Sequence, residues 1–257
     1  MRRWVFALAL AGIVVAAPLA AQDLGPIVSD RPDFTESTGT IRPGHVQLEG
    51  GYTFQKIEDE ESHSFGEILA RIGIGERMEA RLGVGSYTWI DGPGGEIEGY
   101  EDPSIGIKVR FTEGPGDLAP GMPAVSLILA TTVPAGSEEL TADEWQPEAK
   151  LALGWEVNSW LGINSNLNYG YPVEGDERFH QLSASLSASF GVTDRMGAFL
   201  EVFGFSEETP DGDSTRYLDG GVTYSVTDDL QLDARFGVGF NDSDPEHFAG
   251  IGAVVRW

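Results

Sequence analysis

The sequence contains no cysteine, few basic residues and only one long apolar run, at its beginning. The lack of cysteine excludes disulfide scaffolds, thiolate metal sites and cysteine nucleophiles. Only 16 residues are Lys or Arg against 41 that are Asp or Glu, which gives the 257-residue chain a formal net charge of -25. A surface this negative repels phosphates, so we expect no nucleic-acid partner. After Ala21, no apolar run approaches the roughly 18 residues that a membrane-spanning helix needs.

The beginning of the chain has the pattern of a secretory signal peptide. Arg2 and Arg3 precede the apolar run 4–17, and small residues follow up to Ala21. This order predicts that residues 1–21 are removed on export. The alternative is a membrane anchor, but the run is short and ends in Pro and small residues. The mature chain is therefore either secreted and soluble or crosses a membrane as strands.

Apolar and small polar residues alternate along most of the remaining chain. In 229–240, for example, Leu232 and Ala234 alternate with Asp233 and Arg235. A helix cannot keep two such faces apart, because its period is 3.6 residues. The pattern predicts about twelve strands, each near the 9–11 residues that cross a bilayer at a tilt. These strands are 45–56, 64–74, 78–88, 103–112, 123–133, 147–157, 161–171, 181–192, 196–206, 216–226, 229–240 and 247–257.

Short and long connections alternate between these strands, which is typical of an outer-membrane barrel. The exception is the Pro/Gly-rich link 113–122, where a short turn is expected. The expected long loops are 57–63, 89–102, 134–146, 172–178, 207–215 and 241–246. We therefore predict an all-β fold: a closed antiparallel transmembrane β-barrel over 45–257, preceded by a periplasmic segment, 22–44. An even strand number would place both termini on the periplasmic side of a bacterial outer membrane.

The composition of the two faces distinguishes a barrel from a soluble β-sandwich, which also alternates. A sandwich should have a polar face rich in Lys, Glu and Thr, whereas this one is rich in Gly, Ser and Asn, which suit a confined lumen. Aromatic residues near the strand ends match the girdles at the two membrane interfaces. They are Tyr52, Trp89, Trp145, Trp155, Trp160, Tyr169, Tyr171, Tyr217 and Tyr224.

The last strand has its apolar residues on one face and ends in Trp257. A final strand that ends in an aromatic residue resembles the signal read by the barrel-assembly machinery, although Gly250 departs from it. This strand must close the barrel against 45–56, because an unpaired edge is not tolerated in lipid.

Two stretches resemble a known family: Ser29–Ser37 (SDRPDFTES) and Pro43–Tyr52 (PGHVQLEGGY). They look like the family described as "MetA-pathway of phenol degradation", and the similarity is sharpest over 27–55. The resemblance implies an outer-membrane barrel of the transporter or porin kind that takes up small or aromatic compounds. It carries over no catalytic residues.

Acidic residues dominate the expected long loops. An acidic mouth would concentrate cations and disfavour anions, and it could bridge to lipopolysaccharide phosphates through divalent cations. The alternative is adaptation to a salty habitat. No loop has the spacing of a calcium site, so we expect no specific metal.

Alternation also places charged residues inside the barrel, and seven of them lie toward the periplasmic half. These candidates for a constriction are Glu49, Glu79, Arg81, Lys108, Arg110, Asp233 and Arg235. They would select solutes through a transverse field or form a salt-bridged network that braces the wall.

The segment before the first strand supplies candidates for a plug in the lumen. They are Asp30, Arg31, Asp33 and Phe34, and Arg31 would pair with acids of the lumen. The alternative is a periplasmic tail.

We expect no enzyme and no cofactor. The chain has no Gly-x-Ser-x-Gly elbow, and the parity of His180 and Ser183 puts them on opposite faces. The expected function is a channel for the passive passage of small solutes, aromatic or hydrophobic compounds among them, in contact with outer-membrane lipid and lipopolysaccharide. The alternatives are a structural or surface-interaction barrel with a blocked lumen and, third, an outer-membrane hydrolase.

Overall fold

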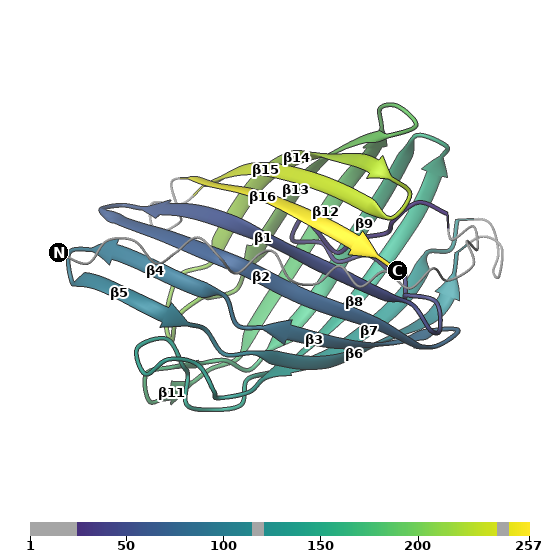
Figure 1. The fold of residues 1–257 in the computed structure, drawn as a ribbon. Coiled ribbons are helices and arrows are strands. Elements are labelled where there is room, and N and C mark those ends of the chain that lie inside the picture. Colours follow the sequence, from purple (N-terminus) through teal and green to yellow (C-terminus); the bar gives the residue numbers. More distant parts are fainter. Residues whose placement is uncertain (1–24, 115–120, 241–246) are drawn as a thin grey trace.

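The structure is a computed structural model that describes residues 25–114, 121–240 and 247–257 (Figure 1). The expected signal peptide, the last acidic loop and most of the link 113–122 lie outside these residues. Fourteen strands form one antiparallel sheet, and two short strands form a separate hairpin. The strands are β1 (Val46–Ile57), β2 (Glu60–Gly75), β3 (Met78–Val84), β4 (Tyr87–Gly92), β5 (Gly95–Tyr100), β6 (Ser104–Glu113), β7 (Ala124–Thr132), β8 (Pro147–Asn158), β9 (Leu161–Gly170), β10 (Val173–Glu174), β11 (Glu177–Arg178), β12 (Gln181–Gly191), β13 (Met196–Phe205), β14 (Thr215–Thr227), β15 (Leu230–Gly239) and β16 (His247–Arg256).

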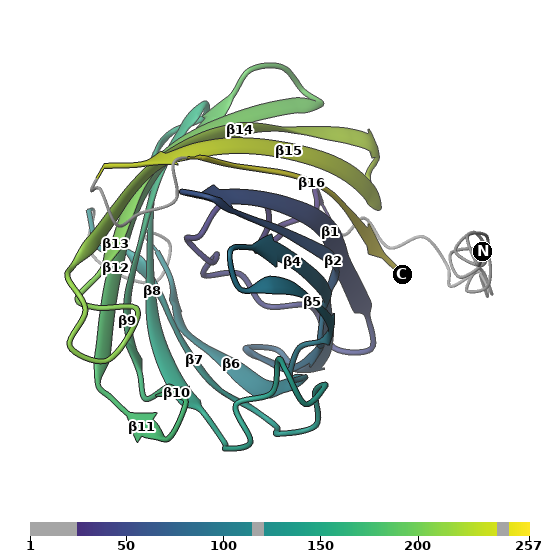
Figure 2. The same ribbon diagram turned by 90° about the vertical axis from the view of Figure 1, so that its left-hand side faces the viewer.

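The large sheet closes on itself, as the ring of strands in Figure 2 shows. β1 pairs with β2 on one side and with β16 on the other. At the seam, the Val46 N–H donates to the Trp257 carbonyl oxygen at 2.9 Å, and the Trp257 N–H donates to the Val46 carbonyl oxygen at 3.0 Å. The final strand therefore leaves no open edge, as lipid requires.

Two of the wall strands are each interrupted once. β3 and β4 follow each other along β2, and β5 and β6 follow each other along β4 and β3. Counted as continuous strands, the wall has twelve. The prediction of a closed antiparallel barrel with about twelve strands is therefore confirmed.

Two of the expected loops are wrong, because hairpins extend the wall beyond the apolar band. β1 and β2 leave only Glu58 and Asp59 as a turn within 57–63, and β4 and β5 occupy most of 89–102. A two-stranded ribbon in water need not have an apolar face. The sequence of such an extension therefore lacks the alternation that identifies the wall strands.

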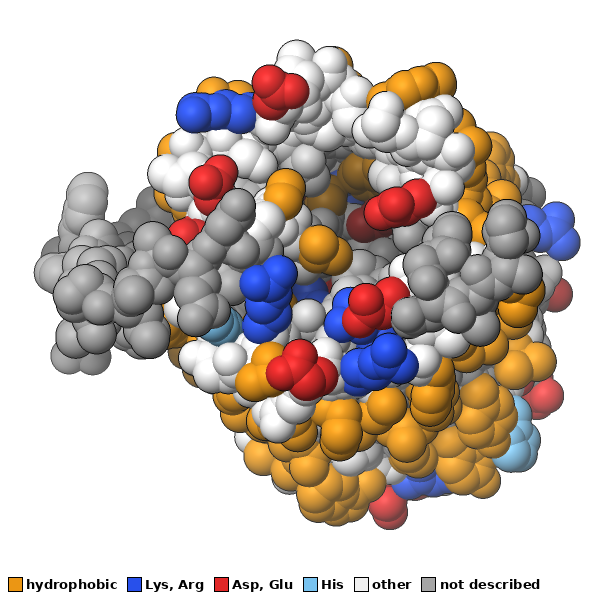
Figure 3. All heavy atoms as spheres, turned by 90° about the vertical axis from the view of Figure 1, so that its right-hand side faces the viewer, with side chains coloured by type: hydrophobic (Ala, Val, Ile, Leu, Met, Phe, Trp, Pro, Cys, Tyr) orange, Lys and Arg blue, Asp and Glu red, His pale blue; other side chains and the backbone are white. Residues whose placement is uncertain are grey.

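The side chains are arranged inside out relative to a soluble protein. The largest fully buried side chains include Arg71, Lys108 and Glu79, whereas Leu200 and Ile251 lie on the outer surface at 55% and 61% exposure. Apolar side chains cover much of the outer wall in Figure 3, below the hollowed short-turn end. This distribution excludes the sandwich, which would bury its apolar rows. Among the described residues, no helix is long and apolar enough to cross a membrane.

One aromatic residue does not belong to the outer girdles. Tyr217 shares its parity with Asp219, and it is 4% exposed on the inner face, where its ring packs on Phe203 at 4.7 Å. Its placement in a girdle was wrong, because position near a strand end does not override the alternation of faces.

Candidate functional site

Residues 25–44, which we call the N-terminal segment, run inside the barrel (Figure 2). Asp30 N–H donates to Glu49 on β1 at 3.0 Å, the Ser126 hydroxyl on β7 donates to the Thr38 carbonyl oxygen at 2.6 Å, and Thr35 Oγ1 lies 2.6 Å from Ser185 Oγ on β12. A short segment can contact strands around the whole ring only from within the lumen.

Glycines of the wall provide the space for the segment. A Cβ on Gly51 would collide with the Arg31 guanidinium, and one on Gly252 would lie 2.5 Å from Arg31 Nε. A Cβ on Gly73 would overlap the backbone of Arg42. The small residues of the inner face therefore leave room for this segment.

Asp30 sits in a basic cluster formed by β2, β3 and β6. Its carboxylate lies 2.6 Å from Arg81 Nη1, 2.8 Å from Lys108 Nζ and 3.4 Å from Arg71 Nη1. Burial alone would raise the pKa of Asp30, but the charges of Arg71, Lys108 and Arg81 hold that pKa well below its usual range. Asp30 is therefore an anion in this state.

Two wall carboxylates complete the ion-pair network around Arg71. Glu49 lies 3.0 Å from Arg71 Nη1, and Glu79 lies 2.9 Å from Arg71 Nε. Because all three side chains are buried, removal of one partner would leave charge without compensation. The network is a unit that includes Asp30.

Glu36 makes a second attachment to basic residues. Its two carboxylate oxygens lie 2.5 Å from Arg81 Nη2 and 2.7 Å from Lys150 Nζ on β8. Burial alone would raise the pKa of Glu36, but Lys150 and Arg81 lower it to about 2. Asp30 and Glu36 thus both bind the segment to the basic side of the lumen.

Asp33 faces the opposite, acidic side of the lumen. The Ser187 hydroxyl on β12 donates to Asp33 Oδ2 at 3.0 Å. Burial, and next to it the charge of Glu201 on β13, raises the pKa of Asp33 to about 8. Asp33 is therefore mainly protonated at neutral pH.

Glu201 binds the backbone of the segment directly. It accepts hydrogen bonds from the Phe34 N–H at 2.7 Å and the Thr35 N–H at 2.8 Å, and also from the Thr35 hydroxyl. Asp219 on β14 is its cross-strand neighbour. In the part of the chain that the structure describes, Asp33, Glu201 and Asp219 form no ion pair with a basic residue within 4.0 Å.

An aromatic cluster lies in the lumen beside these carboxyl groups. The Phe34 ring stacks on Phe203 at 4.6 Å and meets Phe205 edge-on at 5.3 Å. Tyr217 extends the cluster to Phe248 at 6.3 Å. The lumen is therefore not purely polar.

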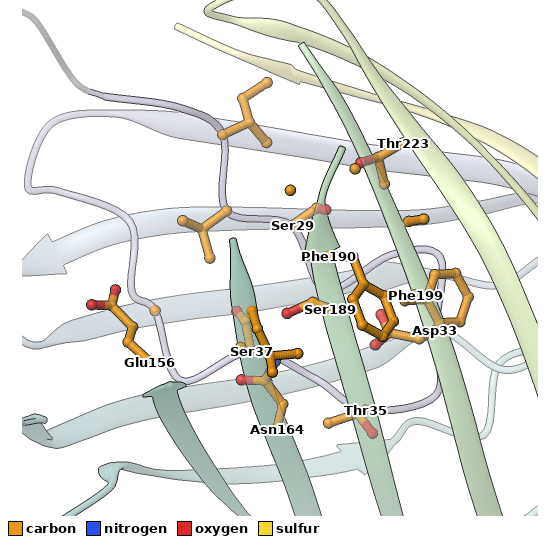
Figure 4. A pocket seen from close by; sticks show the side chains of 18 of the residues that line it. Ser29, Asp33, Thr35, Ser37, Glu156, Asn164, Ser189, Phe190, Phe199 and Thr223 are labelled. Atoms are coloured by element: carbon orange, nitrogen blue, oxygen red, sulfur yellow. The ribbon is translucent and has the colours of Figure 1, made fainter. Parts of the chain in front are cut away.

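Two cavities lie toward opposite ends of the barrel, and the first of them is lined in part by the segment. One of about 770 Å³ lies toward the short-turn end, and Figure 4 shows Asp33, Thr35 and Ser37 of the segment around it with Ser189 and Phe199 of the wall. Another of about 1060 Å³ lies at the long-loop end. Its charged lining is mostly acidic and consists of Glu101, Asp102, Glu139, Asp143, Glu144, Glu174, Asp176, Arg178 and Glu208.

The structure separates the seven constriction candidates into groups. Glu49, Glu79, Arg81 and Lys108 lie in the network around Asp30. Asp233 lies 3.4 Å from Arg31 Nη2, and Arg31 also pairs with Glu67 at 2.7 Å. Arg235 contacts Thr53 Oγ1 at 3.3 Å and lies over the Phe248 ring, whereas Arg110 lies apart and pairs with Glu113 at 2.9 Å.

Several residues of this site are not among the constriction candidates. Alternation places Arg71, Lys150, Glu201 and Asp219 on the lumen face, as the structure does, but these four lie outside the periplasmic half to which the candidates are limited. Glu36 lies within the stretch that carries the family resemblance. Its contacts with Arg81 and Lys150 have no signature in the sequence.

The structure offers little for catalysis or metal binding. Within residues 25–114, 121–240 and 247–257, no group of three His, Asp or Glu side chains is arranged to hold a metal. His180 Nδ1 lies 2.7 Å from the Tyr169 hydroxyl, and Asn168 donates to Ser183 Oγ at 3.0 Å. Tyr169 and Asn168 are neighbours on one strand, so His180 and Ser183 lie on opposite faces.

A closed twelve-stranded wall with an apolar exterior and a polar lumen defines an outer-membrane β-barrel of the channel and porin type. Residues 29–257 match the model of the family described as "Putative MetA-pathway of phenol degradation", and the chain belongs to that family. The resemblance expected from Ser29–Ser37 and Pro43–Tyr52 is therefore confirmed. No curated protein matched the chain in a sequence search.

Solved structures share the fold at low sequence identity. The "COG4313 outer membrane channel" from Pseudomonas putida F1 has a TM-score of 0.69 at 11% identity, over 88% of this chain and 100% of the other. The NanC porin has a TM-score of 0.55 at 11% identity, over 82% and 98%. The translocator domain of the autotransporter NalP from Neisseria meningitidis has a TM-score of 0.51 at 12% identity, over 83% and 87%. At these identities the similarity concerns the barrel fold alone.

Proposed function

We propose that the protein is a passive outer-membrane channel for small solutes and that the N-terminal segment closes its lumen until it is displaced. The observation that carries this proposal is the position of the segment, which crosses the lumen. On one side of the lumen its Asp30 pairs with Lys108, and on the other side its Phe34 N–H donates to Glu201. The stretch from Asp30 to Ile41 lies inside the pore and leaves little room for a solute to pass beside it.

The way in which the segment is bound favours a removable closure. The backbone N–H groups of Asp30, Phe34 and Ile41 donate to the side chains of Glu49, Glu201 and Glu79 rather than to strand backbone. The segment can therefore leave while the hydrogen-bond ladder of the barrel stays intact. Water would enter the opened lumen and solvate the wall charges that lose their partners, which limits the free energy of opening.

For the orientation, we propose that the short-turn end faces the periplasm and the long-loop end faces outward. Both ends of the barrel wall, at Val46 and Trp257, lie at the short-turn end, where the Arg256 N–H donates to the Asp229 carbonyl oxygen of a short turn. Short periplasmic turns and longer external loops are the rule in bacterial barrels. The C-terminal strand would then present Trp257 to the assembly machinery.

For the cargo, the family's description and the aromatic cluster around Phe203 both favour small aromatic or hydrophobic compounds. The acidic cavity at the long-loop end favours cations over anions. Glu49, Glu79, Arg81 and Lys108 would act as the constriction by holding the segment in place.

The second candidate is a barrel with a permanently blocked lumen. The extent of the ion-pair network around Asp30 and Arg71 favours it, because a closure that never opens would gain from such pairing.

A disulfide lock tests the proposal against this alternative. Thr35 Oγ1 and Ser185 Oγ lie 2.6 Å apart, which is close enough for the pair T35C and S185C to bridge segment and wall. The natural chain has no cysteine, so the introduced pair has no competing thiol. Single-channel conductance is recorded in planar bilayers before and after reduction, with each single-cysteine variant as a control.

We expect openings from the wild type, from both single variants and from the reduced pair, and none from the oxidised pair. Openings of equal size and frequency from the oxidised pair would show that solutes bypass the segment, and this would refute the gated channel. A wild type and a reduced pair that never open would instead support the blocked barrel.

A further inference from the structure

We propose that Asp33, Glu201 and Asp219 form a proton-sensitive latch on the N-terminal segment: the closed lumen requires a proton in this carboxyl cluster, and loss of the proton releases the segment. The latch rests on the proposed function, since it needs a segment whose departure opens the barrel. It assigns a role to three carboxyl groups that the ion-pair network does not use.

The first observation is the crowding of the three acids. Glu201 and Asp219 are cross-strand partners on β13 and β14 with the same inward parity, and they are 1% and 2% exposed. Asp33 lies beside Glu201, because it accepts a hydrogen bond from Ser187, the cross-strand partner of Glu201, and the next residue, Phe34, donates to Glu201. Three carboxylates in such a site repel one another unless at least one holds a proton.

The second observation is how few hydrogen-bond donors these three carboxyl groups have. The Ser187 hydroxyl on β12 donates to Asp33, and the Phe34 and Thr35 N–H groups donate to Glu201. Neither carboxylate oxygen of Asp219 has a hydrogen-bond partner among the described residues.

The surrounding cations compensate for the acids only in part. Arg31 of the segment is paired with Asp233 on β15, whereas Arg235, also on β15, offsets part of the charge of Asp219 while it contacts Thr53 Oγ1 and the Phe248 ring. Asp30, three residues before Asp33, adds a further negative charge, although its own cationic partners lie on the other side of the lumen.

The proton has a path from solvent. Asp33 is only partly buried, and it lines the cavity of about 770 Å³ toward the short-turn end (Figure 4). The pKa of Asp33 in the closed state is about 8, raised by burial and then by Glu201. A released segment would carry Asp33 in water with an ordinary pKa near 4.

The sign of the pH effect follows from these two values. A group whose pKa is raised in the closed state stabilises that state fully below its ordinary pKa, and this contribution is lost as pH rises to the raised pKa. The ratio of open to closed protein should therefore increase by up to about tenfold per pH unit from about pH 4 to pH 8 and then level off. Asp30 and Glu36 act in the opposite sense, since their pKa values are lowered, and they weaken closure only in stronger acid.

The test measures open probability in planar bilayers between pH 5 and pH 9 for the wild type, D33N, E201Q and the oxidised T35C/S185C pair. Asparagine at position 33 keeps a polar side chain beside Ser187 but cannot ionise, so D33N should stay closed with no rise above pH 5. E201Q retains an acceptor for the Phe34 and Thr35 N–H groups and removes one like charge. Its rise should therefore level off at a lower pH than that of the wild type.

The outcomes distinguish the latch from the gate. A wild type that opens equally at pH 5 and pH 9, while the oxidised pair stays closed, would overturn the latch and leave the gated channel standing. A D33N curve identical to a rising wild-type curve would also overturn it. Openings of the oxidised pair like those of the wild type would refute the gated channel itself, and the latch with it.

Discussion

Replacement of Asp30 by Asn should open the barrel at neutral pH. Asp30 is 8% exposed, and its carboxylate touches Arg81, Lys108 and Arg71 within 3.4 Å. Asparagine is nearly isosteric, so the change removes one negative charge without leaving a cavity. The three cations then retain Glu79, Glu49 and Glu36, but the partner that the segment contributes at their centre is lost.

The magnitude follows from the burial of this cluster. Removal of one member of a buried ion pair typically destabilises by about 3–5 kcal/mol. The lower value applies here, because an opened lumen admits water to Arg71 and Lys108. A loss of about 3 kcal/mol corresponds to an increase on the order of 100-fold in the ratio of open to closed protein.

The assay is open probability in planar bilayers at pH 7 for the wild type, D30N and E113Q. E113Q removes a charge from an exposed pair with Arg110, and exposed pairs contribute about 0–1 kcal/mol, so this control should change opening little. The heat-modifiable gel shift of each variant confirms a folded barrel. A folded D30N whose open probability equals that of the wild type would refute the idea that Asp30 anchors the segment.

Three further predictions address the wall, the seam and the proton. Leucine at Gly252 would occupy the site of the Arg31 guanidinium, so G252L should raise open probability, whereas G94L, at a position with nothing within 4 Å, should not; equal behaviour of the two variants would exclude displacement of Arg31. Deletion of Trp257 removes both hydrogen bonds that join the chain end to the first strand, and it should lower the fraction of SDS-resistant barrel on gels; an unchanged fraction would show that closure does not depend on this residue. Open probability should rise between pH 5 and pH 8 in the wild type and stay flat in D33N, for the reason given with the proposed latch.

The barrel could be predicted from the sequence because lipid imposes one rule on every wall strand. Residues such as Leu232 and Phe236 must face outward, and the alternation of their neighbours follows. The same rule does not act on residues beyond the bilayer, and for that reason the sequence predicts a loop where the structure has the β4–β5 hairpin. Within the bilayer, strict alternation of faces also places Tyr217 in the lumen, and its stacking on Phe203 agrees with this.

The site could be predicted only in part, because its two halves follow different rules. Alternation placed Glu79, Arg81 and Lys108 inside the barrel, where the structure has them. The segment before Val46 has no periodicity, so nothing in its sequence states that Asp30 meets Lys108, 78 residues away, or that Glu36 meets Lys150. Such partners depend on how an irregular chain crosses the lumen, and only a three-dimensional structure contains that information.

The lumen is electrically divided, and this division gives the acids of the segment opposite roles. Asp30, Asp33 and Glu36 recur at every third position; the first and the last meet Arg81 on the basic side, whereas the middle one meets Glu201 on the acidic side. A chain that crosses a lumen must present residues to both sides, so one of the three acids necessarily faces charge of its own sign. An asparagine at position 33 would remove that repulsion and hold the segment more firmly at neutral pH. The carboxyl group of Asp33 makes closure depend on a proton. Such a dependence has a function only in a barrel whose lumen opens.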